Sequence, residues 1–196
     1  MYKSHLQLVT DLSNYSSPKS KITRMINSKE IIQVKRGIFL YANDNTYSIN
    51  SISSIIYGPS YISFEKAMSF YGLIPEKVTT ITCATFNKKR NKQFHTPIGN
   101  FHYFDVPPKV FPYDTVIMKE NGQNFVIASM EKAICDSLYK INGIKNTDAL
   151  SKLIKENWRI DLNELSKLDR NSLQFLLPLY KRKICNLFAE WFIKEF

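Results

Sequence analysis

The order of patterns in the first 41 residues constrains the fold of this 196-residue chain more than any other feature. Apolar residues at helical spacing predict one short helix over 6–12 and a second helix that begins at Pro18. Ser17 favours that start, because serine caps the first turn of a helix and proline suits its first position. The segment 31–41 is β-branched and aromatic with Arg36-Gly37 inside it, which predicts two strands joined by a tight turn.

The order helix, helix, basic hairpin is that of a winged helix-turn-helix, in which the hairpin is the wing. Six basic residues and one acid between Pro18 and Arg36 give this segment a local charge of +5. Duplex DNA offers phosphates to such a unit, and it offers base edges in the major groove to polar side chains of the second helix. An ordinary basic surface is the alternative interpretation. The candidate DNA-binding residues are Lys19, Ser20, Lys21, Thr23 and Arg24 on the helix, with Lys35 and Arg36 in the wing to hold phosphates or enter the minor groove.

Beyond this unit, strand patterns dominate the middle of the chain and helical patterns dominate the last third. The C-terminal helices begin after Ser129, which is a good cap, and Pro178 separates or kinks the last two. The elements that we expect are helices over 49–57 and from Ser60 to Gly72, a strand over 78–86, hairpins over 94–106 and 116–128, and helices from Ser129 to the tail at 179–196.

These patterns predict an α+β protein of two domains. A winged helix-turn-helix would occupy residues 1–45, and a larger mixed α/β domain closed by C-terminal helices would occupy 46–196, with a linker near Asn43–Thr46. Thirty residues precede Ile31, whereas a full winged helix usually supplies three helices before its wing. Two alternatives follow: one helix is missing and the first domain is truncated, or the polar stretch around Asn14 to Ser17 replaces that helix, and the difference bears on DNA affinity more than on the fold.

Charge and cysteine content limit the partners and the compartment. Lys and Arg number 27 against 17 Asp and Glu, and the resulting charge of +10 favours a polyanionic partner. The three cysteines form no CxxC pair, so we expect buried, inert thiols in a reducing cytoplasm rather than disulfides or zinc. No run of 18 apolar residues and no signal peptide is present, so no membrane association is expected.

Motifs for catalysis are missing from the sequence. There is no GxxxxGK[ST], GxGxxG or GxSxG sequence, and His95 and His102 have no further ligands at metal-binding spacing. Glu65, Glu131 and Asp136 fall on predicted helices, where solvated or salt-bridged carboxylates are the ordinary interpretation, and Lys132 lies four residues before Asp136. We expect no metal, no cofactor and no enzyme activity.

A second basic cluster lies between two predicted strands. It consists of Lys88, Lys89, Arg90 and Lys92, and the segment from Lys77 to Phe104 contains no acid. This loop would add phosphate contacts, contact an acidic partner, or only solvate the end of a hairpin. The sequence slightly favours the last alternative.

Three stretches, taken in order, resemble one known family. The first is Gly37-Ile-Phe-Leu, which follows a short basic strand. The second runs from Ser60 to Pro75, with Tyr-Ile-Ser near its start and Gly-Leu near its end. The third runs from Val126 to Tyr139 and contains Ile-Ala-Ser-Met-Glu-Lys-Ala. Gly99-x-Phe101-x-Tyr103 falls between the last two, as in that family. The family is that of the AbiEi antitoxins, and the resemblance spans nearly the whole chain.

The resemblance implies a bacterial transcriptional regulator from an abortive-infection toxin–antitoxin operon. Its winged helix would bind repeats in its own promoter as an autorepressor. Its second domain would counteract a nucleotidyltransferase-like toxin, in many cases without a stable complex. An alternative is a protein-interaction module that neutralises a toxin without binding DNA. A nucleic-acid enzyme that uses Glu131 or Asp136 is the least favoured alternative.

Overall fold

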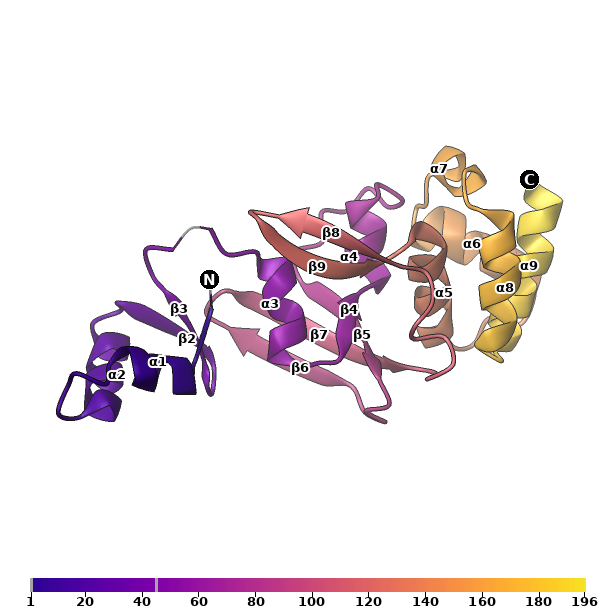
Figure 1. Cartoon of the computed structure of the whole chain (residues 1–196). Coiled ribbons are helices and arrows are strands. Elements are labelled where there is room, and N and C mark those ends of the chain that lie inside the picture. The colour runs from indigo at the N-terminus through magenta and orange to yellow at the C-terminus, as the bar shows by residue number, and fades with distance from the viewer. Residues whose placement is uncertain (1, 45) are drawn as a thin grey trace.

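The N-terminal part of the chain folds into two helices and a small sheet. We describe residues 2–44 and 46–196 from a computed structural model (Figure 1). The expected helices and hairpin are confirmed, and a short strand that the sequence did not predict precedes them. The elements are β1 (Lys3–Ser4), α1 (His5–Asp11), α2 (Pro18–Asn27), β2 (Ile31–Lys35) and β3 (Ile38–Tyr41), and the strand order is β1-β3-β2 with antiparallel pairing throughout.

This N-terminal unit has a small hydrophobic core of its own. Leu8 from α1, Ile22 and Met25 from α2, and Ile31 and Phe39 from the hairpin are buried together. The two helices therefore cover one face of the three-stranded sheet.

The opposite face of the hairpin packs on the rest of the protein. Val34 and Leu40 are buried in the larger core, which continues through the central sheet to the C-terminal helices. The expected domain boundary falls at Asn45, which lies outside the described residues.

A mixed six-stranded sheet forms the centre of the molecule, and α3 (Ile49–Ile56) packs on it. The strand order is β6-β7-β5-β4-β9-β8, with parallel pairing of β5 with β7 and of β4 with β9 and antiparallel pairing elsewhere. The strands are β4 (Ser60–Ile62), β5 (Ile81–Phe86), β6 (Lys92–Thr96), β7 (Gly99–Val106), β8 (Thr115–Glu120) and β9 (Gln123–Ala128).

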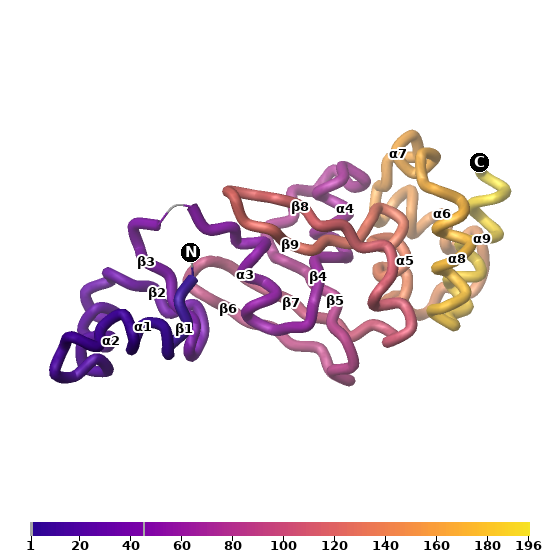
Figure 2. The backbone as a smooth tube through the Cα atoms, viewed as in Figure 1, coloured from indigo at the N-terminus to yellow at the C-terminus, as the bar shows by residue number. Residues whose placement is uncertain are grey.

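Helices close the other end of the molecule. Helix α5 contacts α4, α8 and α9, so it connects the sheet to the C-terminal helices (Figure 2). Among the described residues, no helix is both long and apolar enough to cross a membrane. The remaining elements are α4 (Phe64–Phe70), α5 (Met130–Lys140), α6 (Thr147–Lys152), a π-helical turn η1 (Leu153–Asn157), α7 (Leu162–Ser166), α8 (Arg170–Leu179) and α9 (Lys183–Glu195).

Two helix starts differ from the prediction. The helix expected from Ser60 begins at Phe64, because Ser60–Ile62 forms β4 and pairs with β5 on one side and β9 on the other. The last helix begins at Lys183 rather than at residue 179, because α8 continues through Pro178 in its final turn. Pro178 has no N–H to donate to the carbonyl of Gln174, and α8 ends one residue later, at Leu179.

Candidate nucleic-acid interface

Helix α2 presents most of its predicted DNA-binding side chains on one exposed face. Ile22 and Met25 are buried against the sheet, and this orientation places five polar or basic residues toward solvent. The helix contains no acidic residue, so the face is cationic. The exposed residues are Lys19, Ser20, Thr23, Arg24 and Asn27, and the first four are among the predicted DNA-binding residues.

Local hydrogen bonds hold the short side chains of this face. The Ser20 hydroxyl is 2.8 Å from the Ser17 hydroxyl, and the Thr23 hydroxyl donates to the Lys19 carbonyl at 3.2 Å. Lys21 lies at the margin, half-buried, with its ammonium group 5.4 Å from the centre of the Tyr15 ring. The structure therefore brings together four of the five helix residues that the sequence selected.

The hairpin holds its two basic residues in different environments. The Lys35 ammonium group donates to the carbonyl of Ile56 at 2.7 Å and lies 4.7 Å from the centre of the Phe94 ring. Arg36 is exposed in the turn, beside Gly37, whose φ of +83° suits glycine. Lys35 thus connects the hairpin to the larger unit through contacts that the sequence did not indicate. Arg36 is the wing residue that remains exposed.

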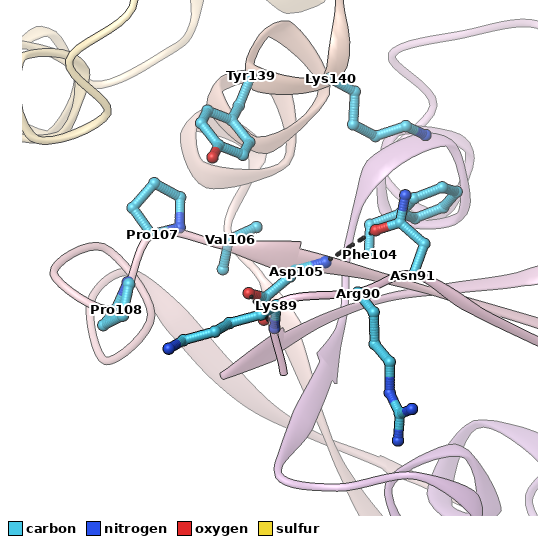
Figure 3. A pocket seen from close by; sticks show the side chains of 10 residues that line it. All are labelled: Lys89, Arg90, Asn91, Phe104, Asp105, Val106, Pro107, Pro108, Tyr139 and Lys140. Atoms are coloured by element: carbon cyan, nitrogen blue, oxygen red, sulfur yellow. Dashed lines mark hydrogen bonds between the residues drawn. The ribbon is translucent and has the colours of Figure 1, made fainter. Parts of the chain in front are cut away.

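The second basic cluster lies in the loop between β5 and β6 and at the first residue of β6. The backbone N–H groups of Lys88 and Lys89 each donate to the Asp105 carboxylate at 2.8 Å, which fixes the loop between β5 and β6. The Lys88 ammonium group lies 5.2 Å from the centre of the Tyr57 ring, and Lys92 is half-buried, while Lys89 and Arg90 are exposed. The loop borders a cavity of about 790 Å³ that reaches the end of α5 (Figure 3).

Asp136 and Lys132 occupy a fully buried polar cluster. The predicted pairing is confirmed, with 3.5 Å between the Lys132 ammonium nitrogen and an Asp136 oxygen, but neither side chain is exposed to solvent. Asp136 also accepts hydrogen bonds from Tyr61, Ser63 and Tyr180, and Lys132 donates to the carbonyl of Val110 and to Tyr180. We call these groups the buried network. Burial lowers the pKa of Lys132, and burial next to Asp136 raises the pKa values of Tyr61 and Tyr180.

The other carboxylates that the sequence singled out make structural contacts. Glu65 forms an ion pair with Lys140 at 3.0 Å, and Glu131 accepts a hydrogen bond from the backbone N–H of Asp169. Within residues 2–44 and 46–196, no group of three or more His, Cys, Asp or Glu side chains could hold a metal ion. The predicted burial of Cys83, Cys135 and Cys185 is confirmed.

Known proteins give no further guide to this surface. No family model matches the chain, and a search of curated proteins finds no match either.

Proposed function

We propose that this chain is a DNA-binding transcriptional autorepressor and antitoxin whose N-terminal unit binds its own promoter. The observation that carries the proposal is the exposed cationic face of α2, with Lys19 and Arg24 beside two hydroxyl side chains. Lysine and arginine hold phosphates, and short polar side chains reach base edges once a helix lies in the major groove.

The arrangement around α2 supports this proposal. A short strand, two helices and a hairpin follow one another, and β3 lies between β1 and β2 in the sheet. A winged helix has this order after its first helix, and in such a unit α2 would be the recognition helix. The buried core of Leu8, Ile22 and Phe39 holds α2 rigidly on the sheet.

The antitoxin part of the proposal rests on the resemblance to the AbiEi family. Residues 46–196 would then counteract a nucleotidyltransferase-like toxin in the bacterial cytoplasm, with or without a stable complex. Coexpression of the chain with the toxin encoded beside it would test this part directly. We expect the intact chain to restore growth. A chain altered in α2 should restore it equally well, because residues 46–196 are unchanged.

A binding titration against the DNA immediately upstream of the protein's own gene tests the repressor part. The double variant Lys19→Ala/Arg24→Ala removes two phosphate contacts. We expect much weaker binding and a salt slope smaller by about 1.8, since each contact contributes about 0.9. Scrambled DNA at two salt concentrations measures the non-specific component.

The control has the same loss of charge elsewhere on the surface. Lys77 and Lys119 are both exposed and lie outside the N-terminal unit, so Lys77→Ala/Lys119→Ala should bind promoter DNA almost as wild type does. Equal weakening by both double variants, or equal affinity of the wild type for scrambled DNA, would refute the repressor proposal.

The position of Lys35 favours one alternative function. Because Lys35 is held against Ile56 and Phe94, the wing has only Arg36 exposed of its two predicted basic residues. A protein-interaction module that neutralises a toxin without binding DNA would need no wing. In that case the wild type gives no promoter footprint, and the Lys19→Ala/Arg24→Ala variant still protects against the toxin.

A further inference from the structure

The cavity beside the β5–β6 loop combines cations with aromatic and amide groups. Lys89 and Arg90 border it on the loop side, and Tyr139 and Lys140 border it at the end of α5. Figure 3 shows the Tyr139 hydroxyl directed from α5 toward the loop, with Lys89 on the opposite border and Arg90 extending outward. We call this cavity the loop hollow. Its volume of about 790 Å³ is large enough for a nucleotide unit.

A second basic hollow begins one residue beyond Lys140, at Ile141. It has a volume of about 270 Å³ and lies between the segment after α5 and the segment that joins α8 to α9, and its cations are Lys181, Arg182 and Lys183. We call it the helix hollow. The guanidinium carbon of Arg182 lies 5.6 Å from the centre of the Tyr139 ring, so a residue that lines the helix hollow contacts one that lines the loop hollow.

Arg182 is held firmly in that position. Its guanidinium group donates to the carbonyl of Ile141 and to the side-chain oxygen of Asn142, both at 2.8 Å. A fixed arginine beside an aromatic ring is a common platform for nucleic-acid bases.

The charge of the combined surface favours a ligand with repeated negative charges. Six cations line the two hollows, and Asp105 is the one acid among the residues that line them. The Asp105 carboxylate is already engaged by the N–H groups of Lys88 and Lys89, and Lys140 is paired with Glu65. Two cations of each hollow therefore remain for a ligand, in addition to the fixed charge of Arg182. They are Lys89 and Arg90 in the loop hollow and Lys181 and Lys183 in the helix hollow.

We infer that the loop hollow and the helix hollow form one binding site for single-stranded nucleic acid. Lys89, Arg90, Lys181 and Lys183 contact successive phosphates, and a base lies against Tyr139. A single strand fits this surface better than a duplex, because its bases are free to enter a hollow and to stack on an aromatic ring.

This site is separate from the proposed promoter-binding face. The β6–β7 turn, at the Thr96 end of β6, adjoins the N-terminal unit, where Pro97 shares a hollow with Ile32 and Gln33. The β5–β6 loop lies at the Lys92 end of the same strand. The single-strand site consequently does not depend on the proposed function of α2.

The test is a fluorescence-anisotropy titration of the full chain with a labelled 15-nucleotide oligo(dT) or oligo(U), and with a 15-base-pair duplex. We expect the single strand to bind more tightly than a duplex of unrelated sequence. Lys89→Ala/Arg90→Ala and Lys181→Ala/Lys183→Ala should each weaken binding about ten-fold and reduce the salt slope by about 1.4, since each phosphate contact on a single strand contributes about 0.7. Tyr139→Leu should weaken binding about five-fold, and Tyr139→Phe should retain it.

Two control variants separate binding at this site from general charge attraction and from binding at α2. Lys77→Ala/Lys119→Ala has the same charge loss outside both hollows and should bind within about two-fold of wild type, because distant exposed charges are screened. Lys19→Ala/Arg24→Ala should lose promoter binding but keep single-strand binding. Equal losses in all the double variants, a loss confined to one hollow, preference for the duplex, or no binding by the wild type would overturn the inference.

Discussion

Asp136 is a charged residue whose surroundings determine what its removal does to the protein. Its carboxylate is fully buried and accepts hydrogen bonds from Ser63 at 2.7 Å, Tyr61 at 2.9 Å and Tyr180 at 2.5 Å. Its ion pair with Lys132 lies within α5, and the hydrogen bonds from Tyr61, Ser63 and Tyr180 join α5 to β4, to the residue before α4 and to the end of α8. A buried ion pair of this kind adds little net stability, but loss of one partner leaves an uncompensated charge in the interior.

We therefore expect Asp136→Ala to reduce the free energy of unfolding by about 3–5 kcal/mol, because the Lys132 ammonium group stays buried without its counter-charge. The double variant Lys132→Met/Asp136→Leu should recover part of that loss, since it removes both charges at similar volume. Urea unfolding at pH 7, followed by circular dichroism, measures both. A loss below about 1 kcal/mol in Asp136→Ala would show that the buried network does not hold a charged pair.

The sequence predicted only the local part of this network. Lys132 and Asp136 are four residues apart on a helix, and that spacing was enough to predict their contact. Tyr61, Ser63 and Tyr180 lie between 44 and 75 residues away in the sequence. No local pattern indicates such partners, so solvated or ordinary salt-bridged carboxylates remained the reasonable interpretation until the fold placed β4 and α8 against α5.

At the scale of the element, the β2–β3 hairpin has two roles. One face covers the N-terminal core through Ile31 and Phe39, and the other contributes Val34 and Leu40 to the larger core. Alternation along a strand predicts two faces, but the bulge between Gln33 and Lys35 changes which residues face which core. Lys35 is directed at Ile56 as a result.

The two basic residues of the hairpin should respond differently to substitution. Lys35→Ala removes a charged hydrogen bond and a cation–π contact, and it should lower the free energy of unfolding by about 1–2 kcal/mol. Arg36→Ala should leave stability within about 0.5 kcal/mol of wild type and weaken promoter binding with a smaller salt slope. Urea unfolding and DNA titration of both variants separate the two roles. A stability loss in Arg36→Ala equal to that in Lys35→Ala would contradict the assignment.

Strand β4 shows where local patterns were not sufficient. Gly58-Pro59-Ser60 predicted a helix start, and the apolar spacing from Phe64 to Tyr71 was correct for α4. Three residues are too few to show a period of two, so Ser60–Ile62 carried no strand signal. Its strand character comes from pairing with β5 and β9, which are distant partners in the sequence.

At the scale of the whole molecule, the sequence predicted which elements exist but not how the sheet is ordered. The hairpins β6–β7 and β8–β9 join neighbours in sequence, and both were predicted. The parallel pairs β5–β7 and β4–β9 connect strands that other elements separate, and only the shared core selects them. The molecule is elongated, with α2 at one end and the helices α5, α8 and α9 toward the other (Figure 1).

The same core predicts how the whole protein responds to alkaline pH. Burial raises the pKa values of the Cys83 and Cys185 thiols to about 12, and it raises those of Cys135, Tyr61, Tyr103 and Tyr180 above their ordinary values. An unfolded thiol loses its proton near pH 9, while the buried thiol keeps it, so the unfolded state binds fewer protons above that pH. Each such group then lowers the free energy of unfolding by about 1.4 kcal/mol per pH unit until its folded pKa is reached.

Two lysines oppose this trend within a limited range. Burial lowers the pKa values of Lys132 and Lys66, so the unfolded state holds their protons more tightly and stability gains from them as the pH rises toward about 10.4. Above that pH their contribution is constant, and the buried tyrosines begin to add to the loss from the thiols. The urea midpoint should therefore fall between pH 9 and 12, most steeply above about pH 10.5.

Urea unfolding under reducing conditions at several pH values between 7 and 11 measures this loss. Cys83→Ala should be less stable than wild type at pH 7, because it leaves a small cavity. Above pH 9 its free energy of unfolding should decrease less steeply than that of wild type, by about 1.4 kcal/mol per pH unit. An exposed thiol would have no such effect, since its pKa is the same in the folded and unfolded states. The same pH dependence in wild type and in Cys83→Ala would mean that the Cys83 thiol is open to solvent, and hence that the core that fixes the sheet is not packed as described.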